Sequence, residues 1–172
     1  VSEFERDLDF LLKNFKSASV KDIQSFTQQP NAQITKSFFP TFDDGMSECF
    51  HVIAPILKRK GIEAAFFINP SFVDNKSLFH RHKASLILKQ ISEQKFKSAE
   101  LSEAERLVKQ EHPSKNLEEF LLRSVFTDHS LLDRVAEIFS LDFNHFLESN
   151  QPYMTMEQIK KLQADGFLIG AH

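Results

Sequence analysis

Two acidic side chains and one histidine lie directly after apolar runs in this sequence. The segment "SFFPTFDDGMSE" places Asp43 and Asp44 behind an aromatic run and ahead of Gly45. A second apolar run, "FLIGAH", ends at His172. Carboxylate oxygens and imidazole nitrogens bind zinc and similar divalent ions, and such an ion would offset the repulsion between adjacent carboxylates. The residue types therefore indicate a metal site in which one aspartate binds the ion and its neighbour serves as a general base.

Two strands joined by a helix are expected to position the acidic pair. The segment "AQITKSFFPTF", residues 32–42, reads as a strand, with Pro40 marking its end or an irregular spot. A helix is predicted over "SECFHVIAPILKRKG", with a kink at Pro55 and a stop at Gly61. The short apolar run "EAAFFIN", residues 63–69, predicts a second strand. A strand, a helix and a strand make a βαβ unit, so the two strands are expected to be parallel.

The pattern of elements divides the chain into three stretches. Residues 1–74 carry N-terminal helices and the βαβ unit, and residues 75–151 carry charge-rich helical periods that predict a large helical insertion. Residues 152–172 add a helix, which begins with a capping box of Thr155 and Gln158, and a third strand, "FLIGAH". The expected fold class is therefore α/β with a helical insertion.

A sheet built from these strands brings the acids and the histidine to one edge. Ligands of a parallel α/β sheet bind beyond the carboxyl ends of its strands. Asp43 and Asp44 follow the first strand there, and His172 ends the third, although 172 − 44 = 128 positions separate Asp44 from His172. Two plain alternatives stay open, because Asp-Asp-Gly is also a common turn and helix-start sequence, and His172 could be an ordinary strand-end residue.

Three segments together resemble the polysaccharide deacetylase family, also known as carbohydrate esterase family four. They are "TFDDG", "LKRKGIEAAFFI" and "LQADGFLIGAH", which have the order and the strand positions of that family. The resemblance covers residues 33–69 and 155–172. It implies a (β/α) barrel, of which this chain holds a part. It also implies a bacterial hydrolase of carbohydrate metabolism that removes acetyl groups, N-acetyl in the first place, from a polysaccharide or oligosaccharide.

The resemblance also implies roles for the three residues. Asp43 matches the catalytic base of the family, Asp44 its aspartate metal ligand, and His172 the first of two histidine ligands. The implied cofactor is a divalent metal, with zinc first and cobalt, nickel or manganese as alternatives. The second histidine would lie four positions beyond His172, and later family motifs are missing too. We therefore expect the N-terminal portion of a catalytic domain, inactive alone, and the start at Val1 rather than Met agrees with an excised piece.

Composition narrows the range of partners. Hydrophobic residues make up 41% and charged residues 26% of the chain, which is typical of a folded globular protein. A formal net charge of -3, without a block of like charge, argues against a nucleic-acid partner. No apolar run reaches the length of about 18 residues that a membrane helix needs. The N-terminus shows no signal-peptide pattern. The family resemblance implies a carbohydrate substrate as the partner.

Other residues carry weaker patterns. Cys49 lies in an apolar helical context and is expected to be a buried hydrophobe. His80 and His82 diverge if they lie on a helix, which disfavours a metal site. An aspartate-nucleophile phosphatase would have its two acids as D-x-D, whereas here they are adjacent. A non-catalytic carbohydrate-binding or protein-interaction domain on a deacetylase-like scaffold is the alternative function, with the helical insertion as its working surface.

Overall fold

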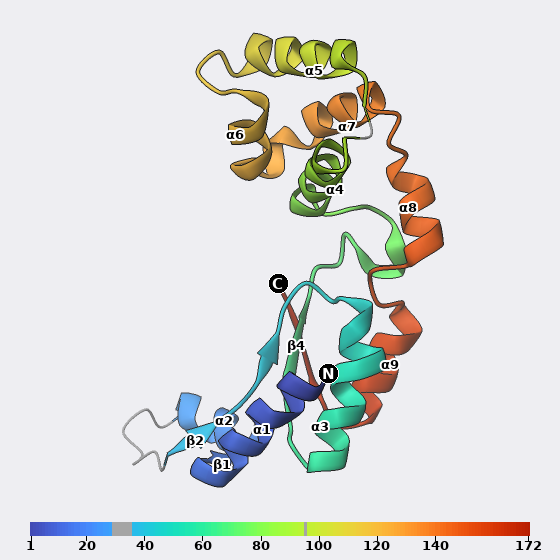
Figure 1. Ribbon diagram of the computed structural model, residues 1–172. Coiled ribbons are helices and arrows are strands. Elements are labelled where there is room, and N and C mark those ends of the chain that lie inside the picture. Colours follow the sequence, from blue (N-terminus) through green and yellow to red (C-terminus); the bar gives the residue numbers. More distant parts are fainter. Residues whose placement is uncertain (29–35, 95) are drawn as a thin grey trace. The chain divides into compact units, whose positions relative to one another are not determined.

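The computed structural model describes residues 1–28, 36–94 and 96–172. They form two compact units (Figure 1). Unit 1 consists of Val1–Lys76 and Gln151–His172, and unit 2 consists of Ser77–Asn150. Unit 2 therefore interrupts unit 1 in sequence, and the acidic pair and the C-terminal histidine all belong to unit 1.

A three-stranded parallel sheet forms the centre of unit 1. Its strands are β3 (Thr41–Phe42), β4 (Ala65–Ile68) and β5 (Leu168–Ala171), in the spatial order β3-β4-β5. Phe42 of β3 is in register with Phe66 of β4, and their rings stack with centroids 5.2 Å apart. The parallel pairing predicted for the first two strands is confirmed, and the third predicted strand joins the other side of β4.

The predicted first strand is present as two short strands, and the irregular spot predicted at Pro40 lies between them. The chain here is divided into β3 and a separate strand, β2 (Ser37–Phe38), which pairs in parallel with β1 (Lys16–Ser17) in a two-stranded sheet. Pro40 lies at the break. It has no N–H to donate to a strand ladder, which interrupts the strand at this position. Its carbonyl still accepts a hydrogen bond from the Ala65 amide at 3.1 Å. The beginning of the predicted strand, residues 32–35, lies outside the described residues.

The crossover from β3 to β4 begins with a wide helical turn. This π turn, η1 (Cys49–Ile53), continues directly as α3 (Ala54–Lys60). Pro55 lies in the first turn of α3 and has no N–H to donate to the preceding residues, which the wider turn accommodates. Gly61 ends α3 in the left-handed conformation, at φ 67°, as the sequence predicts.

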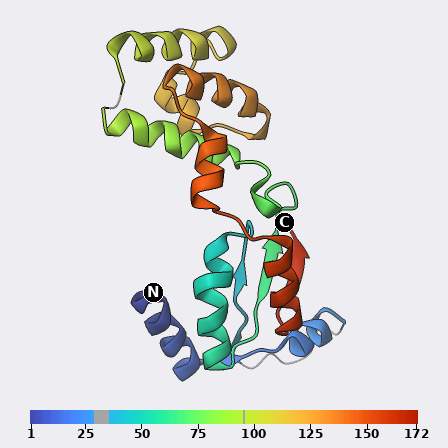
Figure 2. The ribbon, with the colours of Figure 1, turned by 90° about the vertical axis from the view of Figure 1, so that its right-hand side faces the viewer.

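Helices α3 and α9 (Met156–Ala164) lie on the same face of the sheet (Figures 1 and 2). Two further helices, α1 (Ser2–Asn14) and α2 (Val20–Gln28), precede the sheet in the chain. The predicted capping box of α9 is confirmed. The backbone N–H of Gln158 donates to Thr155 Oγ1 at 3.2 Å, and the backbone N–H of Thr155 donates to Gln158 Oε1 at 2.9 Å. The buried core of unit 1 joins α1, the crossover, the sheet and α9, with Leu8, Ile56, Leu57, Phe66, Ile68, Met154, Ile159, Leu162 and Phe167 among its members.

The regular elements described in unit 2 are helices: α4 (His80–Ser92), α5 (Ser98–Glu111), α6 (Leu117–Leu122), the short 3-10 turn η3 (Phe126–Asp128), α7 (His129–Ile138) and α8 (Phe143–Asn150). Their apolar faces form a core that is separate from that of unit 1. It includes Ile87, Val108, Phe120, Leu131, Leu132, Val135 and Phe139. In the described part of the chain, no helix combines the length and the apolar character needed to cross a bilayer.

Candidate metal and catalytic edge of the sheet

The carboxyl edge of the three-stranded sheet brings two distant parts of the sequence together. Asp43 directly follows β3 and His172 directly follows β5, with β4 between these strands. Figure 2 shows the C-terminal end of the chain beside the end of β4. The His172 amide donates to the Ile68 carbonyl at 3.0 Å, which extends the β4–β5 ladder by one bond. The imidazole is therefore anchored at the end of a strand.

A tight turn carries the acids across the end of β4. Asp44 and Gly45 both have positive φ, 66° and 71°, and the Gly45 amide donates to the Asp43 carbonyl at 2.9 Å. A Cβ atom built on Gly45 would lie 3.3 Å from two side-chain atoms of Ile68, the last residue of β4. Glycine at this position therefore meets two requirements, a left-handed backbone and a close approach to the neighbouring strand.

The turn and the strand end place the three predicted residues within reach of one another. His172 Nδ1 lies 3.1 Å from Asp44 Oδ1, and His172 Nε2 lies 4.0 Å from Asp43 Oδ2. The side chains of Asp43 and His172 are 58% and 48% exposed, whereas that of Asp44 is 30% exposed. The imidazole thus faces both carboxylates, and Asp43 is the carboxylate more open to solvent.

The spacing of Asp44 and His172 suits two ligands of one metal ion. Ligand atoms about 2.0–2.2 Å from a tetrahedral zinc ion lie roughly 3.4 Å from one another, close to the 3.1 Å between Asp44 Oδ1 and His172 Nδ1. Within residues 1–28, 36–94 and 96–172, however, no group of three or more His, Cys, Asp or Glu side chains could hold a metal ion. The chemistry and the spacing of this pair fit a metal, to which the pair could contribute two ligands.

A second segment supports the turn from the other side. The Met154 amide donates to the Gly45 carbonyl at 2.9 Å, and the Ser47 amide donates to the Pro152 carbonyl at 2.8 Å. Tyr153 lies between these bonds and forms an isolated antiparallel bridge with Met46. This support has no signal in the sequence, because residues 152–154 have no periodic pattern and their partners lie more than a hundred positions earlier.

The lone cysteine is not available for chemistry at this edge. Cys49 is 4% exposed, and burial raises the pKa of its thiol to about 11. A thiol is nucleophilic and metal-binding in its deprotonated form, which such a pKa disfavours at neutral pH. The prediction that Cys49 is a buried hydrophobe is confirmed.

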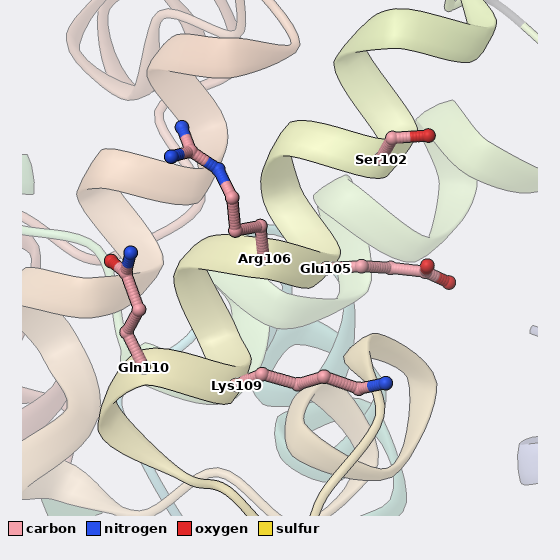
Figure 3. Close-up of a pocket in the computed structure, with 5 residues that line it drawn as sticks. All are labelled: Ser102, Glu105, Arg106, Lys109 and Gln110. Atoms are coloured by element: carbon pink, nitrogen blue, oxygen red, sulfur yellow. The ribbon is translucent and has the colours of Figure 1, made fainter.

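Two surface hollows in the structure lie elsewhere. One lies along the surface of α5 in unit 2. Figure 3 shows its five lining residues on that single helix: Ser102, Glu105, Arg106, Lys109 and Gln110. Their side chains diverge to the two sides of the helix instead of converging on one point (Figure 3). The other hollow is lined by Lys58, Gly61 and Phe167, among others, at the amino ends of β4 and β5. Neither hollow includes Asp43, Asp44 or His172.

A comparison with models of known protein families identifies the family of the chain. The family model described as polysaccharide deacetylase matches residues 31–116, which is half of the chain. The chain belongs to the polysaccharide deacetylase family. The matched stretch contains β3, both aspartates of the turn and β4, continues into unit 2, and ends before His172. No match was found among curated proteins or among solved structures.

Membership supports a hydrolase of the deacetylase type. A polysaccharide deacetylase acts on acetyl-amide bonds of a carbohydrate substrate, and the family is generally metal-dependent. The mixed α/β architecture with parallel strands is compatible with this assignment. The matched stretch includes the turn after β3, and this turn places Asp43 and Asp44 at the carboxyl edge of the sheet.

Proposed function

We propose that the carboxyl edge of the sheet in unit 1 is the metal and catalytic site of a carbohydrate deacetylase. The observation that carries the proposal is the distance of 3.1 Å between Asp44 Oδ1 and His172 Nδ1. These atoms come from strand ends that are far apart in sequence, in a chain whose family removes acetyl groups from carbohydrates. The preferred reaction is hydrolysis of an N-acetyl group, which yields acetate and a free amine on the sugar.

The three residues have separate tasks in this proposal. Asp44 and His172 hold a divalent ion, zinc in the first place, and Asp43 accepts the proton that the attacking water loses. When bound, the ion supplies Lewis acidity to the reaction and offsets the charge of the two carboxylates. Asp43 suits the role of base because its side chain is 58% exposed and so is open to water and substrate. Further ligands have to complete the site, since two protein ligands rarely suffice.

The architecture of the complete domain follows from the same proposal. The three-stranded sheet of unit 1 forms part of a (β/α) barrel, and residues 75–151 form an insertion between the second and third strands of this sheet. Sites of such barrels lie at the carboxyl ends of the strands, where the acidic pair and His172 lie. The chain by itself is then an incomplete catalytic domain, and we expect no turnover from residues 1–172 alone.

The first test exchanges the proposed base in the full-length protein. Asp43→Asn removes the proton acceptor and keeps the size of the side chain. Acetate release from an N-acetylated oligosaccharide should fall by about 10²–10⁴-fold, while the affinity for zinc should change little. Asp44→Asn should instead weaken zinc binding, and a chelator should abolish acetate release by the unaltered protein.

The matched control is Asp7→Asn, the same exchange on an exposed position of α1. It should leave both acetate release and zinc affinity unchanged. Acetate release that survives both the chelator and Asp43→Asn would refute the proposed mechanism. Carbohydrate binding without any acetate release would favour the alternative, a non-catalytic binding domain on a deacetylase-like scaffold.

A further inference from the structure

Asn75 lies at the end of a short helical turn that follows β4, and its side chain forms hydrogen bonds with a residue far along the chain. Asn75 lies in η2 (Val73–Asn75) with φ 57°, a left-handed conformation that asparagine adopts more readily than most residues. Its Nδ2 donates to the Tyr153 carbonyl at 3.2 Å, and its Oδ1 accepts from the Tyr153 amide at 3.0 Å. One side chain therefore satisfies both backbone groups of a residue 78 positions away.

The residue before it strengthens the same connection. Asp74, also at positive φ, donates its amide to the Met154 carbonyl at 3.2 Å. Its Oδ1 accepts from the Met156 amide at 2.9 Å. Together with Asn75, it fixes the backbone from residue 153 to residue 156, where α9 begins.

The far side of this backbone is bonded to the acidic turn. As described above, the Met154 amide donates to the Gly45 carbonyl, and the Ser47 amide donates to the Pro152 carbonyl. Tyr153 and Met154 are 2% and 1% exposed, so the segment is held by packing as well as by hydrogen bonds. Residues 152–154 therefore connect Asn75 to the turn that carries Asp43 and Asp44.

We propose that Asn75 is a positioning residue for the acidic turn and acts through residues 152–154. This inference rests on the proposed function, because it gives Asn75 a role in holding the metal ligand Asp44. The turn needs such support, since Asp44 itself has positive φ and a non-glycine residue stays in that conformation only when its surroundings hold it there. Outer partners that orient ligands commonly control the affinity of a metal site.

The test compares two exchanges at Asn75 with one control elsewhere. Asn75→Gly permits the positive φ and removes both side-chain hydrogen bonds, whereas Asn75→Asp keeps the acceptor for the Tyr153 amide and removes the donor. The control is Asn116→Gly, because Asn116 also accepts from a backbone amide, that of Glu119 at 2.8 Å, but caps α6 in unit 2. Cobalt(II) is titrated into each full-length protein, and its visible absorption reports binding.

We expect cobalt(II) affinity to fall about ten-fold or more with Asn75→Gly, to fall less with Asn75→Asp, and to stay unchanged with Asn116→Gly. Amide hydrogen exchange should become faster at Met154 and Ser47 with Asn75→Gly, while the amide of Phe66 in β4 keeps its protection. That pattern separates a local effect on the turn from a general loss of stability, which would speed exchange at Phe66 as well.

Unchanged cobalt(II) affinity and unchanged exchange in Asn75→Gly would overturn the inference, and so would an equal rise of exchange throughout unit 1. Failure of the proposed function has a different signature, because the unaltered protein itself would then neither bind cobalt(II) nor release acetate. In that case, the exchange rates of Met154 and Ser47 still decide whether Asn75 holds the acidic turn.

Discussion

His80 shows how one buried nitrogen can make a helical unit sensitive to pH. Among the described residues, its Nδ1 atom is buried and has no hydrogen-bond partner. The rings of Phe79 and Phe126 contact the imidazole edge-on, with centroids 4.4 Å and 6.5 Å away. Burial lowers the pKa of His80, and the charge of Arg81 acts in the same direction, whereas Asp128 opposes it. The folded protein therefore favours the neutral imidazole.

This preference predicts how stability depends on pH. The unfolded chain protonates His80 near its ordinary pKa of 6.5, while the folded chain does so at a lower pH. As the pH falls through 6.5, the unfolded state gains protons first, so the free energy of unfolding should decrease. His80→Phe should lose less stability than the unaltered protein between pH 7.5 and pH 5.5, as measured by urea unfolding.

His145→Gln, an exchange of an exposed histidine on α8, provides the comparison and should retain the pH dependence of the unaltered protein. If the free energy of unfolding depended on pH equally in His80→Phe and the unaltered protein, His80 would not be the source of this pH dependence.

The residues of the candidate site differ in how visible they are in the sequence. Asp43, Asp44 and His172 could be predicted because strand-end positions show as short apolar runs followed by polar residues. Asn75 could not, because it bonds to the backbone N–H and C=O of Tyr153, which every residue except proline carries alike. The hydrogen bonds of Asp74 to Met154 and Met156 are hidden for the same reason.

At the level of elements, local signals worked where one residue type sets the geometry. The stop of α3 at Gly61 and the capping box of α9 were predictable because each depends on neighbours in sequence. The division of the first strand was not, because the place where β2 ends depends on its pairing with β1 (Lys16–Ser17). Pro40 marked an irregular spot, but the sequence left open whether the strand ended there.

Gly170 in β5 provides a test of the sheet itself. A Cβ atom at this position would lie 2.7 Å from Cδ1 of Phe67, its partner in β4, which is too close for carbon atoms. Gly170→Ala should therefore lower the free energy of unfolding by about 1–3 kcal/mol, measured by chemical denaturation. Combining it with Phe67→Leu, which removes the opposing ring, should cost less than the sum of the two single exchanges.

Phe67→Leu alone serves as the reference for the lost ring, so the four proteins form a double-mutant cycle. Strictly additive effects would mean that the ring of Phe67 does not limit the space at Gly170. In that case, the loss of stability in Gly170→Ala would not come from contact between the new methyl group and the ring of Phe67.

At the level of the whole molecule, the two units have separate cores. The buried clusters around Phe66 and around Phe120 share no residue. The chain leaves unit 1 after Lys76 and returns at Gln151, and the hydrogen bonds between Asn75 and Tyr153 hold these two points close together. A short connection can therefore replace unit 2 without pulling on the sheet of unit 1.

We expect each unit to fold without the other. Residues 77–150 expressed alone should show cooperative thermal unfolding and dispersed NMR signals, and so should a chain in which a short Gly-Ser linker replaces them. Residues 77–128, which lack α7 with its buried Leu132 and Val135, should not fold. Loss of structure in either complete unit would show that the two cores depend on each other.

The separation of the two halves of the candidate site also sets an order of events during protein synthesis. His172 follows Asp44 by 172 − 44 = 128 residues, which a ribosome adds in roughly 6–26 s at about 5–20 residues per second. Strand β4 ends at Ile68 and β5 begins at Leu168, so for 168 − 68 = 100 of these residues one edge of the apolar strand β4 is unpaired. Such an edge can pair with other chains. Until β5 has left the ribosome, this edge of β4 is therefore a place at which the nascent protein can aggregate.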